Sequence, residues 1–184
     1  MRAPSHLFLS DPEVYPPGED SRFLLGSLPD LTGTVADVGT GSGFLACAMA
    51  SQAGPVMATD VNPAALRLAR RNAAENRMQV EIVRADLLRG VRQRFRHIVF
   101  NPPYLIPEAR GAWIERSWNQ DGVLPRFLEE AGDWLLPDGE VHLLVAGDDA
   151  TSRTVIEDRF TTLRTATRRF FFEEIHALSL RPRD

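Results

Sequence analysis

A glycine-rich segment between two regular elements constrains the fold of this chain most strongly. Residues 34–38 form a short apolar run, residues 37–43 read D-x-G-x-G-x-G, and residues 44–53 have a helical pattern. Glycines at a strand-to-helix turn let the backbone approach a ligand closely, and the helix N-terminus offers free N–H groups. The spacing differs from the G-x-G-x-x-G of dinucleotide sites. The acidic Asp37 favours a ligand with an amino group over a pyrophosphate.

Two further apolar runs also end in acids. Residues 55–60 end at Asp60, and residues 80–84 lead into Asp86. An acid that ends the second strand, about 20 residues past the glycines, usually binds ribose hydroxyls. The alternative role of Asp60 is to cap the next helix, although Asn62 could do so instead. Asp86 could contact an adenine amino group, or it could be a carboxylate in a solvated loop.

A fourth apolar run, residues 97–100, is stopped by Asn101-Pro102-Pro103-Tyr104. Prolines cannot donate to a sheet ladder and they fix φ, so this loop should be stiff. The side-chain oxygen of Asn101 and the carbonyl of Pro102 can accept hydrogen bonds from a planar NH2 group, and Tyr104 can stack on it. Taken alone, the four residues could equally be a loop that only ends a strand.

The remaining pattern alternates between strands and helices. Residues 88–96 are rich in arginine and are interpreted as a solvated helix face, with a phosphate-contacting role as the alternative. We expect an α/β fold with a mostly parallel seven-stranded sheet, helices on both faces and a C-terminal antiparallel hairpin. We expect one domain over 1–184, in which 1–33 is a lead-in or lid and 34–184 is the core. Further helices are predicted at 22–28, 64–76, 124–136 and 150–160, and further strands at 140–146, 162–167 and 175–180.

Composition limits the other classes of protein. The net charge of −4 argues against a broad grip on nucleic acid. A single cysteine, Cys47, excludes an internal disulfide and a cysteine zinc cluster, and the four histidines lack metal-ligand spacing, so no metal is predicted. We find no signal peptide and no apolar run of about 18 residues, which predicts a cytoplasmic protein that does not span a membrane.

In combination, residues 37–43, Asp60, Asp86 and residues 101–104 resemble class I S-adenosylmethionine-dependent methyltransferases. The stretches VYPPGEDS at 14–21 and IERSW at 114–118 resemble the smaller HemK-like enzymes, which methylate the glutamine of the Gly-Gly-Gln loop in class I translation release factors. The resemblance covers residues 14–181. It departs from the family at Pro16, Gly18 and Asn119-Gln120, where the relatives carry Glu, Ala and Gly-Gly.

The resemblance implies a Rossmann-like class I methyltransferase fold, S-adenosylmethionine as cofactor and a release factor as protein substrate. It implies a catalytic loop formed by Asn101, Pro102, Pro103 and Tyr104. It also implies cofactor contacts from Ser21, Asp37, Gly39, Thr40, Gly41, Gly43, Asp60, Val61, Asp86, Leu87 and Asn101. Small relatives use a zinc-binding activator subunit beside the third strand. The alternative for residues 80–84 is a free edge blunted by Glu81 and Arg84.

Other functions remain open at this point. The loop 101–104 permits methylation of an adenine or cytosine amino group in RNA or DNA equally well. A non-catalytic protein that binds S-adenosylmethionine is a further alternative. The insert 105–122 reads as a lid or as a packed surface loop, and Phe170-Phe171-Phe172 reads as buried packing. The pattern does not predict an oligomeric state.

Overall fold

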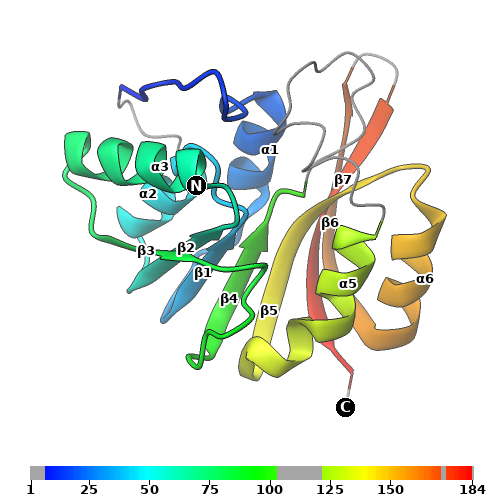
Figure 1. The fold of residues 1–184 in the computed structure, drawn as a ribbon. Helices are drawn as coiled ribbons and strands as arrows, with labels where there is room; N and C mark the ends of the chain where they lie inside the picture. The colour runs from blue at the N-terminus through cyan, green and yellow to red at the C-terminus, as the bar shows by residue number, and fades with distance from the viewer. Residues whose placement is uncertain (1–6, 103–121, 171–172, 184) are drawn as a thin grey trace.

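The computed structural model describes residues 7–102, 122–170 and 173–183. One seven-stranded sheet runs through the molecule in the order β3-β2-β1-β4-β5-β7-β6 (Figure 1). Strand β7 is antiparallel to both β5 and β6, whereas the pairs among β1 to β5 are parallel. The predicted α/β fold and C-terminal antiparallel hairpin are therefore confirmed. The strands are β1 Val35–Val38, β2 Val56–Asp60, β3 Val80–Arg84, β4 Phe95–Phe100, β5 Leu135–Ala146, β6 Phe160–Phe170 and β7 Glu173–Pro182.

Helices cover both faces of this sheet, as predicted (Figure 1). Helices α1 (Glu19–Ser27) and α2 (Phe44–Ala50) pack on one face, and α3 (Pro63–Glu75) lies beside α2. Helices α5 (Val123–Glu130) and α6 (Ala150–Arg159) cover the other face, with the short 3-10 helix η1 (Ala131–Trp134) after α5. Among the described helices, none is long and apolar enough to cross a bilayer.

Strand β1 shows how the two layers of the core arise. All four of its residues are buried, because the strand lies inside a sheet that is covered on both sides. Successive side chains point to opposite faces, so Val35 joins the cluster under α1 and α2. Ala36 and Val38 join the cluster under α5 and α6. Continuous apolar runs in the sequence therefore correspond to central parallel strands.

The helix predicted over residues 88–96 does not form, and the helix predicted over residues 124–136 is too long. No helix forms between Arg84 and Phe95, because Leu87 and Gly90 adopt positive φ values of 56° and 84° that end any helical run. The helix predicted at 124–136 ends at Glu130 and continues as η1 through Gly132, a poor helix former. Strand β5 then begins at Leu135, earlier than predicted.

Residues near both ends of the chain also differ from the predicted boundaries. Helix α1 begins at Glu19 rather than at Arg22, so Glu19 and Asp20 lie in its first turn and Gly18 is the N-cap. The C-terminal hairpin is longer than predicted, since β6 and β7 pair from Phe160–Pro182 to Phe170–Glu173. Phe170 packs edge-on against Phe23 at 5.8 Å between ring centroids, which confirms packing at that residue. Residues 171–172 and the insert at 105–121 lie outside the described part of the chain.

Candidate active site

Several of the predicted site residues that the structure describes lie where the parallel strands end. Asp37 lies in β1, Asp60 ends β2 and Asn101 follows β4. Parallel pairing aligns the ends of these strands, since Val38 is opposite both Thr59 of β2 and Phe100 of β4. Carboxyl ends of strands in open α/β sheets are where ligands bind. The sheet therefore brings acids that are distant in sequence to one edge.

Asp37 links the glycine loop to helix α2 through hydrogen bonds. It is 1% exposed, and its Oδ2 atom accepts hydrogen bonds from Thr40 Oγ1 at 2.6 Å and from the Ala46 backbone N–H at 3.0 Å. Burial raises the pKa of Asp37 to about 7, although both hydrogen bonds oppose this shift and Asp60 adds to it. A buried carboxyl with a raised pKa favours the approach of a cationic ligand, because a positive charge would stabilise its ionised form.

The glycines of the loop serve different purposes. Gly43 has φ +79°, and a Cβ atom there would lie 3.0 Å from Ala69 Cβ, so it allows α2 to approach α3 closely. Gly41 has φ +53°, and a Cβ atom there would meet nothing nearer than 3.9 Å. The Gly41 backbone N–H donates to Asp60 Oδ2 at 3.0 Å. Among the three glycines of this loop, Gly41 is therefore the one that combines a left-handed backbone with the most open space.

Asp60 holds the loop after β2 rather than the next helix. Its Oδ1 atom accepts a hydrogen bond from the Asn62 backbone N–H at 2.8 Å. Asn62 is the N-cap of α3, and its side chain accepts from the Ala64 N–H at 2.8 Å. The alternative role of Asp60 as helix cap is therefore wrong. Burial raises the pKa of Asp60, and its backbone hydrogen bonds oppose this. The neighbouring Val61 is 45% exposed.

Asp86 is an ion-paired loop carboxylate. Its Oδ1 atom lies 2.6 Å from Nη2 of Arg126 on α5, and its Oδ2 atom lies 3.7 Å from Nη1 of Arg89. Leu87 follows with positive φ, and its carbonyl accepts a hydrogen bond from Thr59 Oγ1 at 2.9 Å. Asp86 is thus positioned at the edge of the sheet by α5 as well as by β3.

Asn101 is held by the lead-in helix. Its Nδ2 atom donates to Asp20 Oδ2 at 2.9 Å and to Ser21 Oγ at 3.2 Å. The second oxygen, Asp20 Oδ1, is buried and has no hydrogen-bond partner among the described residues. A Cβ atom at Gly18 would clash with that oxygen, so glycine leaves room for the carboxylate where related lead sequences carry alanine.

Asp20 was not predicted to belong to the site. Its position beside Ser21, in the stretch at residues 14–21 that resembles the family, is the sequence feature that could have indicated such a role. Pro102 is buried directly after Asn101. Pro103 and Tyr104, the other two residues of the predicted catalytic loop, lie outside the described residues, so their roles stay predictions.

These contacts suit a ligand that carries both positive charge and hydrogen-bond donors. Asp37 and Asp60 have pKa values raised mainly by burial, and Asp20 carries an orphaned buried oxygen. An unpartnered polar atom in the interior is costly unless something binds it. This edge of the sheet therefore offers hydrogen-bond acceptors, whereas a pyrophosphate site would offer backbone N–H donors.

Comparisons with known proteins point to one family. The profile of the family described as methyltransferase small domain matches residues 8–173. A putative protein N5-glutamine methyltransferase of Methanocaldococcus jannaschii is 34% identical over 154 residues, which cover 78% of each chain. A release factor glutamine methyltransferase of Deinococcus radiodurans is 43% identical over 100 residues, covering 53% of this chain and 36% of the relative.

Solved structures show the same fold. The ribosomal protein L11 methylase of Lactobacillus delbrueckii subsp. bulgaricus superimposes with a TM-score of 0.67 at 24% sequence identity. The superposition covers 90% of this chain and 78% of that structure. The Rossmann-like topology described above is therefore the fold of class I methyltransferases.

Proposed function

Because this chain belongs to the methyltransferase small-domain family, and is therefore an S-adenosylmethionine-dependent methyltransferase, we propose that it methylates the side-chain amide of a protein glutamine. The favoured substrate is the glutamine of the Gly-Gly-Gln loop in a class I translation release factor. The relatives named for glutamine methylation support this choice. The structural observation that carries the proposal is the pair of hydrogen bonds that the Asn101 side chain donates to Asp20 and Ser21 of α1.

These hydrogen bonds fix which way the Asn101 amide faces. Asp20, as a carboxylate, only accepts hydrogen bonds, so the Asn101 atom facing it must be the NH2 group. The Asn101 oxygen then lies on the other side of the amide, and the carbonyl of Pro102 follows directly in the chain. Two acceptors on a rigid loop match the two hydrogens of a primary amide. A glutamine side chain presents that group.

The proposed methyl transfer depends more on positioning of the substrate amide than on a general base. An amide nitrogen is a poor nucleophile because its lone pair is delocalised into the carbonyl. When bound, S-adenosylmethionine would supply an activated methyl group and leave as S-adenosylhomocysteine, and the nitrogen that receives the methyl group would release one proton to water. Asn101 and Pro102 hold the nitrogen in a near-attack geometry. Their acceptor oxygens also stabilise positive charge as it develops on that nitrogen.

The acids at the strand ends are proposed to hold the cofactor. Asp37 and its loop are proposed to face the amino group, consistent with the raised pKa of this buried carboxyl. Asp60 is proposed to bind the ribose and Asp86 the adenine. The remaining contacts are assigned to Ser21, Gly39, Thr40, Gly41, Gly43, Val61 and Leu87. Of these, the structure gives Gly43 a packing role between α2 and α3.

A partner subunit belongs to the same proposal. Strand β3 is an edge of the sheet, and its residues Val80, Ile82 and Val83 are only half-buried. An uncovered edge strand can pair with another chain. We therefore propose that a small zinc-binding activator pairs with β3, although the charges of Glu81 and Arg84 disfavour such pairing. A release factor as substrate also requires a cytoplasmic location, which stays a prediction.

The deciding experiment compares three acceptors with isotopically labelled cofactor. The intact release factor, the same factor with its loop glutamine replaced by alanine, and structured RNA are incubated with the chain. Mass spectrometry then locates the label. We expect one methyl group on the loop glutamine and none on the variant. Label on a nucleobase would establish the nucleic-acid alternative. Cofactor binding without any transfer, with or without an activator, would establish a non-catalytic protein.

A further inference from the structure

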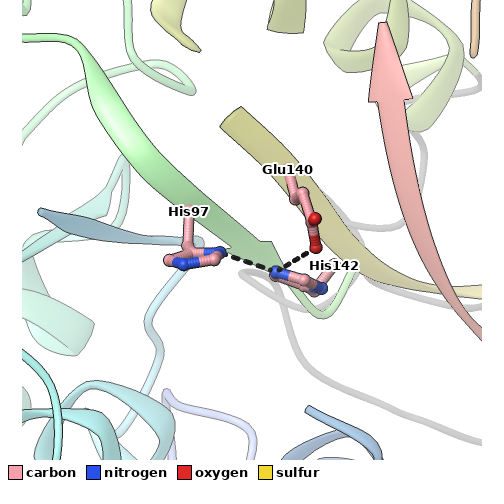
Figure 2. Close-up of side chains that lie close together, drawn as sticks. All are labelled: His97, Glu140 and His142. Carbon is pink, nitrogen blue, oxygen red and sulfur yellow. Dashed lines mark hydrogen bonds and ion pairs between the residues drawn. The ribbon is translucent and has the colours of Figure 1, made fainter. Parts of the chain in front are cut away.

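A second group of polar residues lies inside the sheet, away from the strand ends. His97 of β4 and Glu140 and His142 of β5 are all buried, and their ligand-type atoms lie within 4.8 Å of one another (Figure 2). Parallel pairing aligns His97 with Glu140, and alternation along β5 places His142 on the same face as Glu140. That face also carries Val35 and Val99, which pack under α1 and α2.

We propose that His97, Glu140 and His142 form a zinc site that is separate from the methyl-transfer site. His97 Nδ1 lies 3.0 Å from His142 Nε2, and Glu140 Oε2 lies 4.0 Å from the same nitrogen. Zinc bonds of about 2.0–2.2 Å in a tetrahedron place ligand atoms roughly 3.3 Å apart. Side-chain shifts on the order of 1 Å would complete that geometry.

The surroundings of His142 orient it as a ligand. Its Nδ1 atom lies 2.9 Å from Ser179 Oγ on β7, so Nε2 is the nitrogen that faces the cluster. A hydrogen bond on the distal ring nitrogen is the usual support of a metal-binding histidine. Burial lowers the pKa of His142 to about 3 and also lowers that of His97.

The carboxylate of Glu140 is shared with two arginines. Arg181 Nη2 lies 2.9 Å from its Oε1 atom, and Arg164 Nη1 lies 3.4 Å from its Oε2 atom. Arg164 is 55% exposed, so its guanidinium can move into water when a cation binds Oε2. The two positive charges should weaken binding relative to a site with unpaired carboxylates. Two nitrogen ligands favour zinc over magnesium or calcium.

A cavity borders His142, one of the three proposed ligands. It measures about 180 Å³ and is lined by Leu24 and Ser27 of α1 together with His142, Arg164 and Ser179. The space beside His142 can hold a water molecule as the fourth zinc ligand. Without zinc, the short distance between the two rings is a hydrogen bond between neutral imidazoles, which is the competing explanation.

The histidines were predicted to have no metal role because their sequence spacing is irregular. Sheet pairing brings two of them together, since His97 and His142 are 45 residues apart in the chain. Their alignment depends on β4 pairing with β5, which no local pattern in the sequence reveals. The third described histidine, His176, lies outside this group and contacts Thr167 and Arg153.

The proposal is tested by measuring the zinc affinity of the untagged chain in competition with a chromophoric chelator. We expect one zinc ion per chain in the wild type and in the matched control His176→Ala. His142→Ala should lose that ion, and Ser179→Ala should bind it roughly 10- to 100-fold more weakly. Magnesium should not compete.

A second measurement, made on the wild type alone, tests the proposal even if His142→Ala does not fold. Cobalt(II) should give the visible absorption bands of a tetrahedral site at one equivalent, and zinc should abolish them. Absence of stoichiometric zinc in the folded wild type overturns the proposal. Equal zinc affinity in the wild type and a folded His142→Ala variant overturns it too, and leaves the histidines as a hydrogen-bonded pair.

Discussion

The side-chain nitrogen of Asn101 lies 2.9 Å from Oδ2 of Asp20, although 81 residues separate them in the chain. This hydrogen bond joins the lead-in helix α1 to the loop after β4. It also sets the orientation of the amide proposed to hold the substrate. Helix α1 is thus in contact with the candidate site, and Asp20 is proposed to act on the substrate through Asn101.

Asp20→Ala should lower kcat by roughly 10- to 100-fold, because hydrogen bonds to charged groups contribute about 1.5–3 kcal/mol. Without this acceptor, the Asn101 amide can rotate and offer its NH2 group to the substrate. Cofactor affinity should change little. Steady-state kinetics and cofactor titration separate the two effects.

Glu19→Ala is the matched control for Asp20→Ala. It removes the neighbouring acid of α1, whose side chain is 73% exposed and whose carboxylate pairs with Arg168 at 3.5 Å. Activity should stay near the wild-type value. An equal loss of cofactor affinity and kcat in Asp20→Ala would instead make Asp20 a cofactor ligand.

Asn101→Ala should reduce turnover by about 100-fold or more, since one preorganised hydrogen-bonding group at a reacting centre accounts for roughly 10²–10³ in rate. The proposed cofactor contacts of Asp37 and Asp60 remain in this variant, so cofactor affinity should stay close to the wild type. Single-turnover transfer to the glutamine substrate measures the effect. Near-normal turnover would refute the proposed role of Asn101.

The strand ends were predictable from the sequence because each central strand is a short apolar run closed by an acid or a glycine loop. Asp37, Asp60 and Asn101 are at the expected edge for that reason. The contacts of Asp20 were not predictable, since they depend on where α1 docks on the sheet. The helix expected over 88–96 does not form, and Gly90, which lies inside that range and adopts a positive φ, was the sequence signal against it.

The stability of the free chain should fall with rising pH on account of Asp37. Its folded-state pKa is about 7 against an ordinary value of 3.8, so the unfolded chain loses this proton first. The contribution is fully present below about pH 4 and is lost as the pH rises through 7, on the order of a few kcal/mol. Asp37→Asn should flatten this dependence in thermal unfolding measured between pH 4 and 8.

Cofactor affinity should follow the opposite trend. A cationic ligand favours the ionised carboxylate, so affinity should rise as the pH approaches 7 in the wild type. The rise should be absent in Asp37→Asn. Identical pH profiles of the two proteins, for both unfolding and binding, would mean that Asp37 does not titrate in this range.

Gly43→Ala should destabilise the fold more than Gly41→Ala does. Both glycines have positive φ, so alanine costs roughly 1–2 kcal/mol in backbone strain at either position. Only at Gly43 would the new Cβ atom also press on α3, at 3.0 Å from Ala69 Cβ and 3.1 Å from its Cα. Overpacking of this kind adds about 1–3 kcal/mol.

The two alanine variants separate packing from ligand binding. Gly41→Ala places its methyl group in open space at the candidate cofactor loop, so it should weaken cofactor binding with a smaller loss of stability. Denaturant unfolding and cofactor titration of both variants measure the difference. If Gly41→Ala were the less stable protein, the close approach of α2 to α3 would not be what requires glycine at position 43.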